Sequence, residues 1–179
     1  MSSIFTHPAP IIALGVALGL RRIPARLLVV AAVFSILPDV DAAGFRFGIS
    51  YGSWLGHRGF SHSLLFALLC GAFGAWAAPF LKASRLLSGT VCFLAVASHI
   101  ALDALTNGGL GVAAFWPFSD ARYFFPWQPI QVSPLSLKAF FTTYKGLRVI
   151  ASELLWVWLP LMLMAFTLRP FMRKKSTRR

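Results

Sequence analysis

The sequence predicts an all-α fold, a single integral membrane domain over residues 1–179 with about five transmembrane helices. Three observations predict this fold. Hydrophobic residues make up 58% of the chain, charged residues only 12%, and the mean hydropathy is +0.72, far from the averages of soluble domains. Long apolar segments recur along the whole chain, and clusters of Lys and Arg separate several of them.

The apolar segments differ in length. A helix needs about 20 apolar residues, each rising about 1.5 Å, to cross a hydrocarbon layer of about 30 Å. Segments 63–81, 86–105 and 149–168 approach that length. Segments 10–20 and 27–37 are shorter, so they are predicted as a tight hairpin, as half-inserted helices or as buried pieces of the bundle.

Between the fourth and fifth segments, residues 106–148 are rich in aromatic residues, glycine and proline, which predicts a long outer loop. A short interfacial helix is expected at 138–144. Two interpretations of the loop remain open. Its aromatic residues form a belt at the membrane interface, or the loop covers a site as a lid.

Basic residues predict the orientation of the helices. Of the 17 Lys and Arg, five lie in the turns after the first and third segments and six in the tail 169–179. The positive-inside rule places these turns and the tail in the cytoplasm, so the N-terminus is expected outside. The net charge of +12 is explained by this topology and by attraction to anionic membrane lipid, and no nucleic-acid partner is expected.

Ionisable side chains are rare apart from these basic ones, with five acidic residues and four histidines. On the predicted topology, most of them fall at helix ends on the outer side, and these are His7, Asp39, Asp41, His57, His62, His99 and Asp103. Ionisable groups beside membrane helices are costly and usually functional. We therefore predict that these residues form one shared site.

The residue types indicate metal chemistry. His99 and Asp103 are four residues apart, so on a helix they share a face. Asp39 and Asp41 follow Pro38, which is expected to end a helix, so they are placed in a loop with both side chains on the same side. Imidazole and carboxylate together suit zinc first, and also manganese or iron. One or two ions are expected, and an open coordination position would supply hydroxide for hydrolysis.

Several roles stay open at this point. Either His57 or His62 could be an acid/base group instead of a ligand. Arg58 either reaches toward lipid headgroups or grips a phosphate of the substrate. Ser63 is expected as an N-cap. Glu153 is either paired with another residue inside the helix bundle, or it supports the metal ligands without binding the metal itself.

A set of short motifs resembles a known family. The motifs are His7, "PDVD" at 38–41, "HRGFSHS" at 57–63, "SHIALDALTNGG" at 98–109 and "FWPFS" at 115–119. Together they resemble the YdjM-like family of bacterial inner-membrane proteins, described as membrane-bound metal-dependent hydrolases. The resemblance implies a hydrolase site built from the seven residues above. A looser similarity to zinc-dependent phospholipase C points to phosphoesters.

The resulting prediction is a metal-dependent hydrolase of the bacterial inner membrane, with its site facing the periplasm and a phosphoester in a lipid-like molecule as substrate. His57 and Arg58 are predicted as catalytic residues. The predicted metal ligands are His7, Asp39, Asp41, His62, His99 and Asp103. The alternative from another class is a metal-ion or small-solute transporter that uses the same cluster. The third interpretation is a structural membrane protein that a bound metal stabilises.

Overall fold

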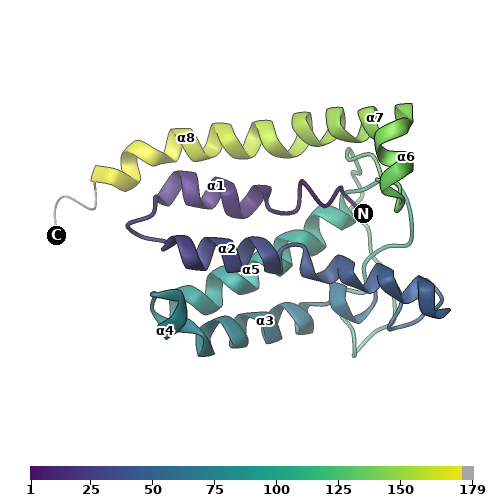
Figure 1. Ribbon diagram of the computed structural model, residues 1–179, viewed down its shortest axis with the longest axis horizontal. Helices are drawn as coiled ribbons and strands as arrows, with labels where there is room; N and C mark the ends of the chain where they lie inside the picture. Colours follow the sequence, from purple (N-terminus) through teal and green to yellow (C-terminus); the bar gives the residue numbers. More distant parts are fainter. Residues whose placement is uncertain (175–179) are drawn as a thin grey trace.

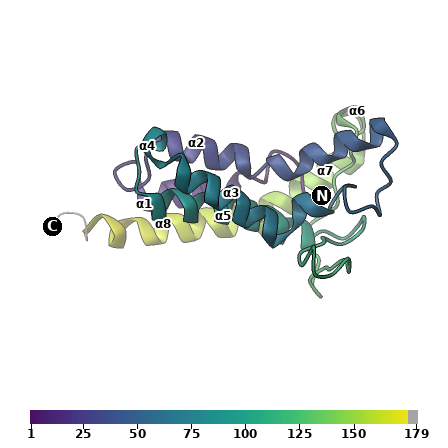
Figure 2. The same ribbon diagram turned by 90° about the horizontal axis from the view of Figure 1, so that it is seen from below.

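Long helices that run side by side along one axis make up most of the structure (Figures 1 and 2). The computed structural model describes residues 1–174, and over this range it contains helical segments and no strand. Two isolated backbone bridges, Thr106 with Ile130 and Val112 with Tyr123, are the only strand-like pairing in this range. The predicted all-α fold is confirmed. Of the basic tail predicted at 169–179, residues 175–179 lie outside the described range.

The first half of the chain starts with a helical hairpin of α1 (Ala9–Leu18) and α2 (Ala25–Phe34). α2 leads into the 3₁₀ helix η1 (Leu37–Phe47), so an apolar helical run extends over Ala25–Phe47. α2 ends before Pro38, as expected, but the expectation that a loop follows is wrong, because Asp39 and Asp41 lie in η1. Pro38 lies in the first turn of η1, where the missing N–H of proline is not needed.

The next elements are the short 3₁₀ helix η2 (Phe60–His62), α3 (Leu64–Trp76), α4 (Ala78–Leu81) and α5 (Arg85–Ala104). Ser63 caps α3 as expected, because its hydroxyl accepts a hydrogen bond from the Phe66 N–H at 3.1 Å. The predicted helix 63–81 is interrupted at Ala77, and α4 restarts with Pro79 in its first turn.

The C-terminal part contains α6 (Leu137–Thr142), α7 (Tyr144–Glu153), the π-helical segment η3 (Leu154–Trp158) and α8 (Leu159–Lys174). The last three form one continuous apolar run, Tyr144–Met172. The irregular chain after α5 ends before α6, so the loop is shorter than the predicted 106–148. α6 lies where the short helix 138–144 was expected.

Within residues 1–174, three helical runs are long and apolar enough to cross a membrane, namely Ala25–Phe47, Arg85–Ala104 and Tyr144–Met172. α1 and α3 have 10 and 13 residues. At about 1.5 Å per residue, these two helices extend only about 15 and 20 Å. All five predicted segments are helical, but only three of them belong to runs of membrane-spanning length.

α5 is the central helix and packs closely against α3 through small residues. An added Cβ on Gly74 of α3 would lie 2.6 Å from the Cys92 sulfur of α5, and one on Gly71 would lie 3.1 Å from the carbonyl oxygen of Gly89. Glycine therefore lets the two backbones approach each other, as is common between membrane helices. The C-terminal half of α5, which carries His99 and Asp103, also packs in one core cluster with α3, where Ala67 lies with Val96 and Ile100.

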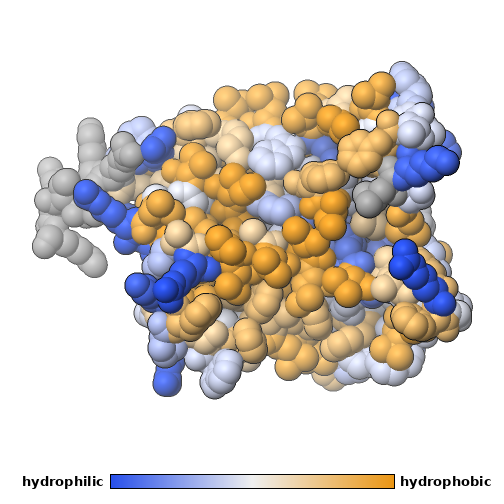
Figure 3. Space-filling model, in the orientation of Figure 1, coloured by the Kyte–Doolittle hydropathy of each residue, from blue (hydrophilic) through white to orange (hydrophobic). Residues whose placement is uncertain are grey.

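The outer surface of the helices is apolar. Large side chains such as Leu68, Phe73, Leu163 and Phe166 are at least half exposed. Hydrophobic residues cover the middle of the face in Figure 3, and hydrophilic residues gather at its two ends. Soluble monomers rarely expose apolar patches of this extent, whereas a bilayer requires them. The surface therefore fits a protein that several helices hold in a membrane.

Candidate metal centre

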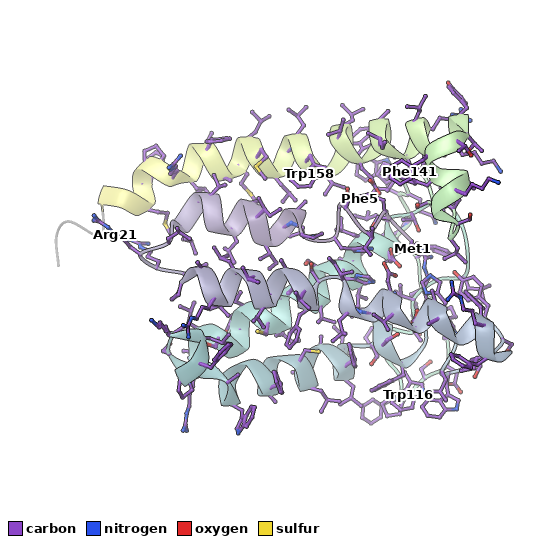
Figure 4. The ribbon with its side chains drawn as sticks, viewed as in Figure 1. Met1, Phe5, Arg21, Trp116, Phe141 and Trp158 are labelled. Carbon is purple, nitrogen blue, oxygen red and sulfur yellow. The ribbon has the colours of Figure 1, made fainter. Side chains whose placement is uncertain are left out.

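The predicted ionisable residues gather at one end of the helices. Figure 4 places Met1 toward this end and Arg21 at the opposite one. Four parts of the chain contribute, and these are the stretch before α1 (His7), η1 (Asp39 and Asp41), the turn before α3 (His57, Arg58 and His62) and the C-terminal half of α5 (His99 and Asp103). All are buried except Asp41, which is partly buried. The structure thus brings together the residues that the sequence assigns to one site.

His99 and His62 lie at the centre of the cluster. Their Nε2 atoms are 2.9 Å apart. Nε2 of His99 lies 3.6 Å from Oδ1 of Asp39, and Nε2 of His62 lies 3.4 Å from Oδ2 of Asp103. Ligand atoms bound to one ion at about 2.0–2.2 Å are separated by about 3–3.6 Å. These four residues therefore have the spacing of a ligand set for a single ion.

His7 completes this cluster from the N-terminal stretch. Its Nε2 lies 3.2 Å from Oδ2 of Asp39 and 3.7 Å from Oδ1 of Asp103. Its ring stacks on that of His99, with centroids 3.7 Å apart and an angle of 17° between the planes. His7 therefore lies beside a ligand group of two imidazoles and two carboxylates, a combination that zinc, manganese and iron accept.

Hydrogen bonds fix the tautomers of the two central histidines. Nδ1 of His99 lies 2.7 Å from the Ser35 carbonyl oxygen, which can only accept, so this nitrogen carries the hydrogen. Nδ1 of His62 lies 3.2 Å from Oδ2 of Asp41 and likewise faces an acceptor. Nε2 of His99 therefore presents a lone pair to Nε2 of His62, 2.9 Å away. In the metal-free protein a proton on Nε2 of His62 bridges the two nitrogens, and a metal ion would take the place of that proton. Hydrogen bonds from Nδ1 orient histidine ligands in metal sites in the same way.

The charge of the cluster also favours a bound cation. Both carboxylate oxygens of Asp39 are buried and have no hydrogen-bond partner in the described part of the chain. Asp39, Asp41 and Asp103 are accompanied by one buried arginine, Arg58. Burial opposes a charge on His62, yet the nearby carboxylates, Asp103 foremost, raise the pKa of His62 to about 10. A divalent cation would offset the same negative charge.

Asp41 does not face the central cluster. In a 3₁₀ helix each residue turns by about 120°, so residues two apart point in different directions. The expectation that Asp39 and Asp41 point the same way is therefore wrong. Asp41 instead contacts Nδ1 of His57 at 2.6 Å and Nδ1 of His62 at 3.2 Å, and it accepts a hydrogen bond from the Ser61 hydroxyl. Asp41, His57 and His62 lie close enough together to form a second group of metal ligands, in which Asp41 is partly exposed.

The guanidinium of Arg58 is fully buried and contacts Asp103 of the cluster. It donates to Oδ2 of Asp103 at 3.1 Å, to Thr106 Oγ1 at 2.8 Å, and to the carbonyl oxygens of Gly108 and Leu110 at 3.1 and 2.7 Å. Four of the five N–H groups of an arginine are therefore engaged. The backbone of Arg58 is left-handed, with φ of 64°, which a non-glycine residue rarely adopts. Gripping a substrate phosphate, as predicted, would require these bonds to break.

Some residues with structural roles at the site carry no sequence signal. Arg122, in the loop after α5, donates to the carbonyl oxygens of His57 and Ser53 at 3.1 Å each. Together with Arg58 it attaches this loop to the turn that carries His57. From the sequence, a loop arginine that binds other segments cannot be told apart from one that is exposed. These contacts bind the loop to the site, so they do not favour the interpretation of the loop as a lid that moves freely.

Apolar helices and a buried histidine–aspartate cluster at one end define a membrane protein with a candidate metal centre. The family model described as YdjM inner membrane protein matches residues 1–176, and the chain belongs to that family. The resemblance noted in the sequence is confirmed.

A curated relative extends the comparison. The chain is 44% identical over 168 residues to the inner membrane protein YbcI of Escherichia coli (strain K12), covering 92% of this chain and 95% of the relative. No solved structure matches the chain. Together with the apolar helices, these matches support a multi-pass location in the inner membrane.

Proposed function

We propose that this protein is a membrane-bound metal-dependent hydrolase that cleaves a phosphoester in a lipid-like substrate. One observation carries the proposal, the convergence of Nε2 of His62 and Nε2 of His99, 2.9 Å apart, beside the Asp39 carboxylate, whose buried oxygens accept no hydrogen bond from the described residues. A divalent transition ion, zinc by preference, would supply a bound water of lowered pKa and a Lewis acid for the phosphoryl group. Asp39, His62, His99 and Asp103 would hold it, with His7 beside them.

His57 is the residue best placed to handle a proton. Its Nδ1 lies 2.6 Å from the Asp41 carboxylate and therefore carries a hydrogen. Its Nε2 is buried and has no hydrogen-bond partner in the described residues. Nε2 can thus accept a proton from the attacking water and later return it to the leaving oxygen. Asp41 orients both this imidazole and that of His62.

A lipid-like substrate is supported by where the cluster lies. It is at one end of apolar helices, and aromatic residues occur at the same end. Trp54 and Trp116 stack with their centroids 5.4 Å apart, and Phe118 is 95% exposed. Aromatic side chains of this kind favour the boundary between hydrocarbon and headgroups. A molecule with its phosphate at that boundary would reach the metal centre without leaving the membrane.

The proposed hydrolysis is tested with the full-length protein in detergent, loaded with zinc and incubated with phosphorylated lipids such as phosphatidic acid and a polyprenyl phosphate. We expect the His57→Ala variant to retain its metal and to lose about 10²–10⁴-fold of the hydrolysis rate. Ser98→Ala, a polar change on α5 whose hydroxyl bonds only within its own helix, is the control. Metal uptake into vesicles without hydrolysis would support the transporter instead.

The orientation is part of the proposal. We place the metal centre on the periplasmic side, with five helical passes and the basic turns at Arg21, Arg26 and Lys82 in the cytoplasm. With Cys70 and Cys92 replaced, we expect cysteines at positions 50 and 118 to react with an impermeant maleimide in intact spheroplasts. A cysteine at position 82 should react only after lysis. The reverse pattern would invert the orientation.

A further inference from the structure

A buried carboxylate at the end of α7 is used by no step described above. Glu153 is 2% exposed and forms no ion pair with any residue in the described range. Instead, it accepts hydrogen bonds from the Ser3 N–H, from the Ser3 hydroxyl at 2.6 Å and from the Thr6 hydroxyl at 2.8 Å. One turn further along, the indole N–H of Trp158 donates to the same Thr6 hydroxyl at 3.0 Å. Glu153 is thus bound to the N-terminal stretch.

The same stretch reaches the metal centre with its other side chains. The Ser2 N–H donates to Oδ1 of Asp103 at 2.8 Å, and the Ser2 hydroxyl lies 3.1 Å from Nε2 of His7. Ser2 and His7 are completely buried. Figure 4 shows Phe5, of the same stretch, beside the helical run that carries Trp158, and its ring lies 6.0 Å from that of Phe140 in α6. Residues 3 and 6 therefore face Glu153, while residues 2 and 7 face the metal centre.

A charged acceptor suits this position. Residues 1–7 contain no regular helix, so bonds to other elements must hold them in place. A buried carboxylate is costly unless strong donors surround it, and hydrogen bonds to a charged acceptor are about twice as strong as neutral ones. Three donors from two residues of the stretch meet this need. The helix widens into the π-helical segment η3 directly after Glu153, and such segments often occur at functional sites.

We propose that Glu153 is a positioning residue, whose carboxylate holds residues 1–7 so that His7 reaches the metal centre. This inference rests on the proposed metal centre and adds to it a carboxylate that does not itself contact the ion.

The test compares Glu153→Ala, Glu153→Gln, His7→Ala and the double variant of His7 and Glu153 in the full-length protein. Cobalt(II) serves as the probe, because its absorption spectrum reports the number and type of ligands. We expect Glu153→Ala and His7→Ala to weaken cobalt binding by a similar factor of about 10–100 and to change the spectrum in the same way. The double variant should be no weaker than His7→Ala alone, because both changes remove the same ligand.

Glu153→Gln keeps one acceptor oxygen, so it should fall between wild type and Glu153→Ala. If Glu153→Ala does not fold, the comparison of Glu153→Gln with wild type tests the proposal instead. Ser152→Ala is the matched control, because this neighbouring hydroxyl bonds to Val149 and Gln131 and not to residues 1–7. We expect it to leave cobalt binding and the spectrum unchanged.

Hydrogen exchange of the peptide that contains residues 1–7, measured without metal, separates this inference from the proposed function. We expect faster exchange in Glu153→Ala than in wild type and in Ser152→Ala. If wild type binds no cobalt, the proposed metal centre fails, and the exchange result still decides whether Glu153 holds the stretch. Unchanged exchange in Glu153→Ala, or faster exchange with an unchanged cobalt spectrum and affinity, would overturn the inference.

Discussion

Replacing Asp39 with asparagine is expected to remove metal binding while the metal-free protein stays as stable as wild type. Both carboxylate oxygens of Asp39 lack a hydrogen-bond partner in the described residues, and asparagine keeps an oxygen that can face Nε2 of His7, which lies 3.2 Å from Oδ2. The charge of Asp39 is buried near a second carboxylate, Asp103, and removing it relieves repulsion. Its loss takes away a charged ligand, and we expect metal affinity to fall about 100-fold or more.

Metal content by elemental mass spectrometry and thermal unfolding in detergent measure the two halves of this prediction. Asp120→Asn is the matched control, since Asp120 is exposed in the loop after α5 and the chemical change is the same. Wild-type metal content in Asp39→Asn would remove Asp39 from the ligand set. A large loss of metal-free stability would show that Asp39 serves the fold.

Replacing Arg58 with leucine is expected to destabilise the protein by roughly 3–5 kcal/mol, since it removes the buried guanidinium that donates to the Asp103 carboxylate. Arg58 also donates to Thr106 and to the carbonyl oxygens of Gly108 and Leu110, so the loop after α5 would lose its attachment as well. In a chain of this size, such a loss lowers the melting temperature by on the order of 10 °C. Arg58→Lys should recover only part of it, because lysine cannot reproduce the planar fork.

Thermal unfolding of the metal-free variants in detergent separates this role from the phosphate grip that the sequence indicates. Arg46→Leu, at an exposed arginine of η1, is the control and should unfold like wild type. If Arg58→Leu instead kept wild-type stability and lost only hydrolysis, the substrate role would be correct and the burial argument wrong.

Much of the fold could be predicted from the sequence. The apolar segments, the cap at Ser63 and the short helix after the loop follow from local composition, which acts within a few residues. Helix continuity was less predictable. The break at Ala77 and the continuation of the helical run from α2 into η1 depend on how the helix ends pack, and a hydropathy pattern does not record this.

The members of the candidate site could also be predicted, but their roles could not. Ionisable residues in an apolar chain are so costly that their positions alone mark a site. Whether a carboxylate faces the centre or supports it depends on its direction around the helix axis, which differs between residues two apart, as Asp39 and Asp41 show. Arg122 could not be identified at all, because its partners lie 65 or more residues away in the chain.

Composition and motifs thus predict the membrane class, the family and the group of residues that meet at one end of the helices. That Arg58 supports Asp103 instead of facing outward, and that Glu153 binds the N-terminal stretch across a separation of 150 residues, became visible only in the packed helices. The physical reason is that such bonds depend on distances of about 3 Å between distant segments, which form only when the helices pack.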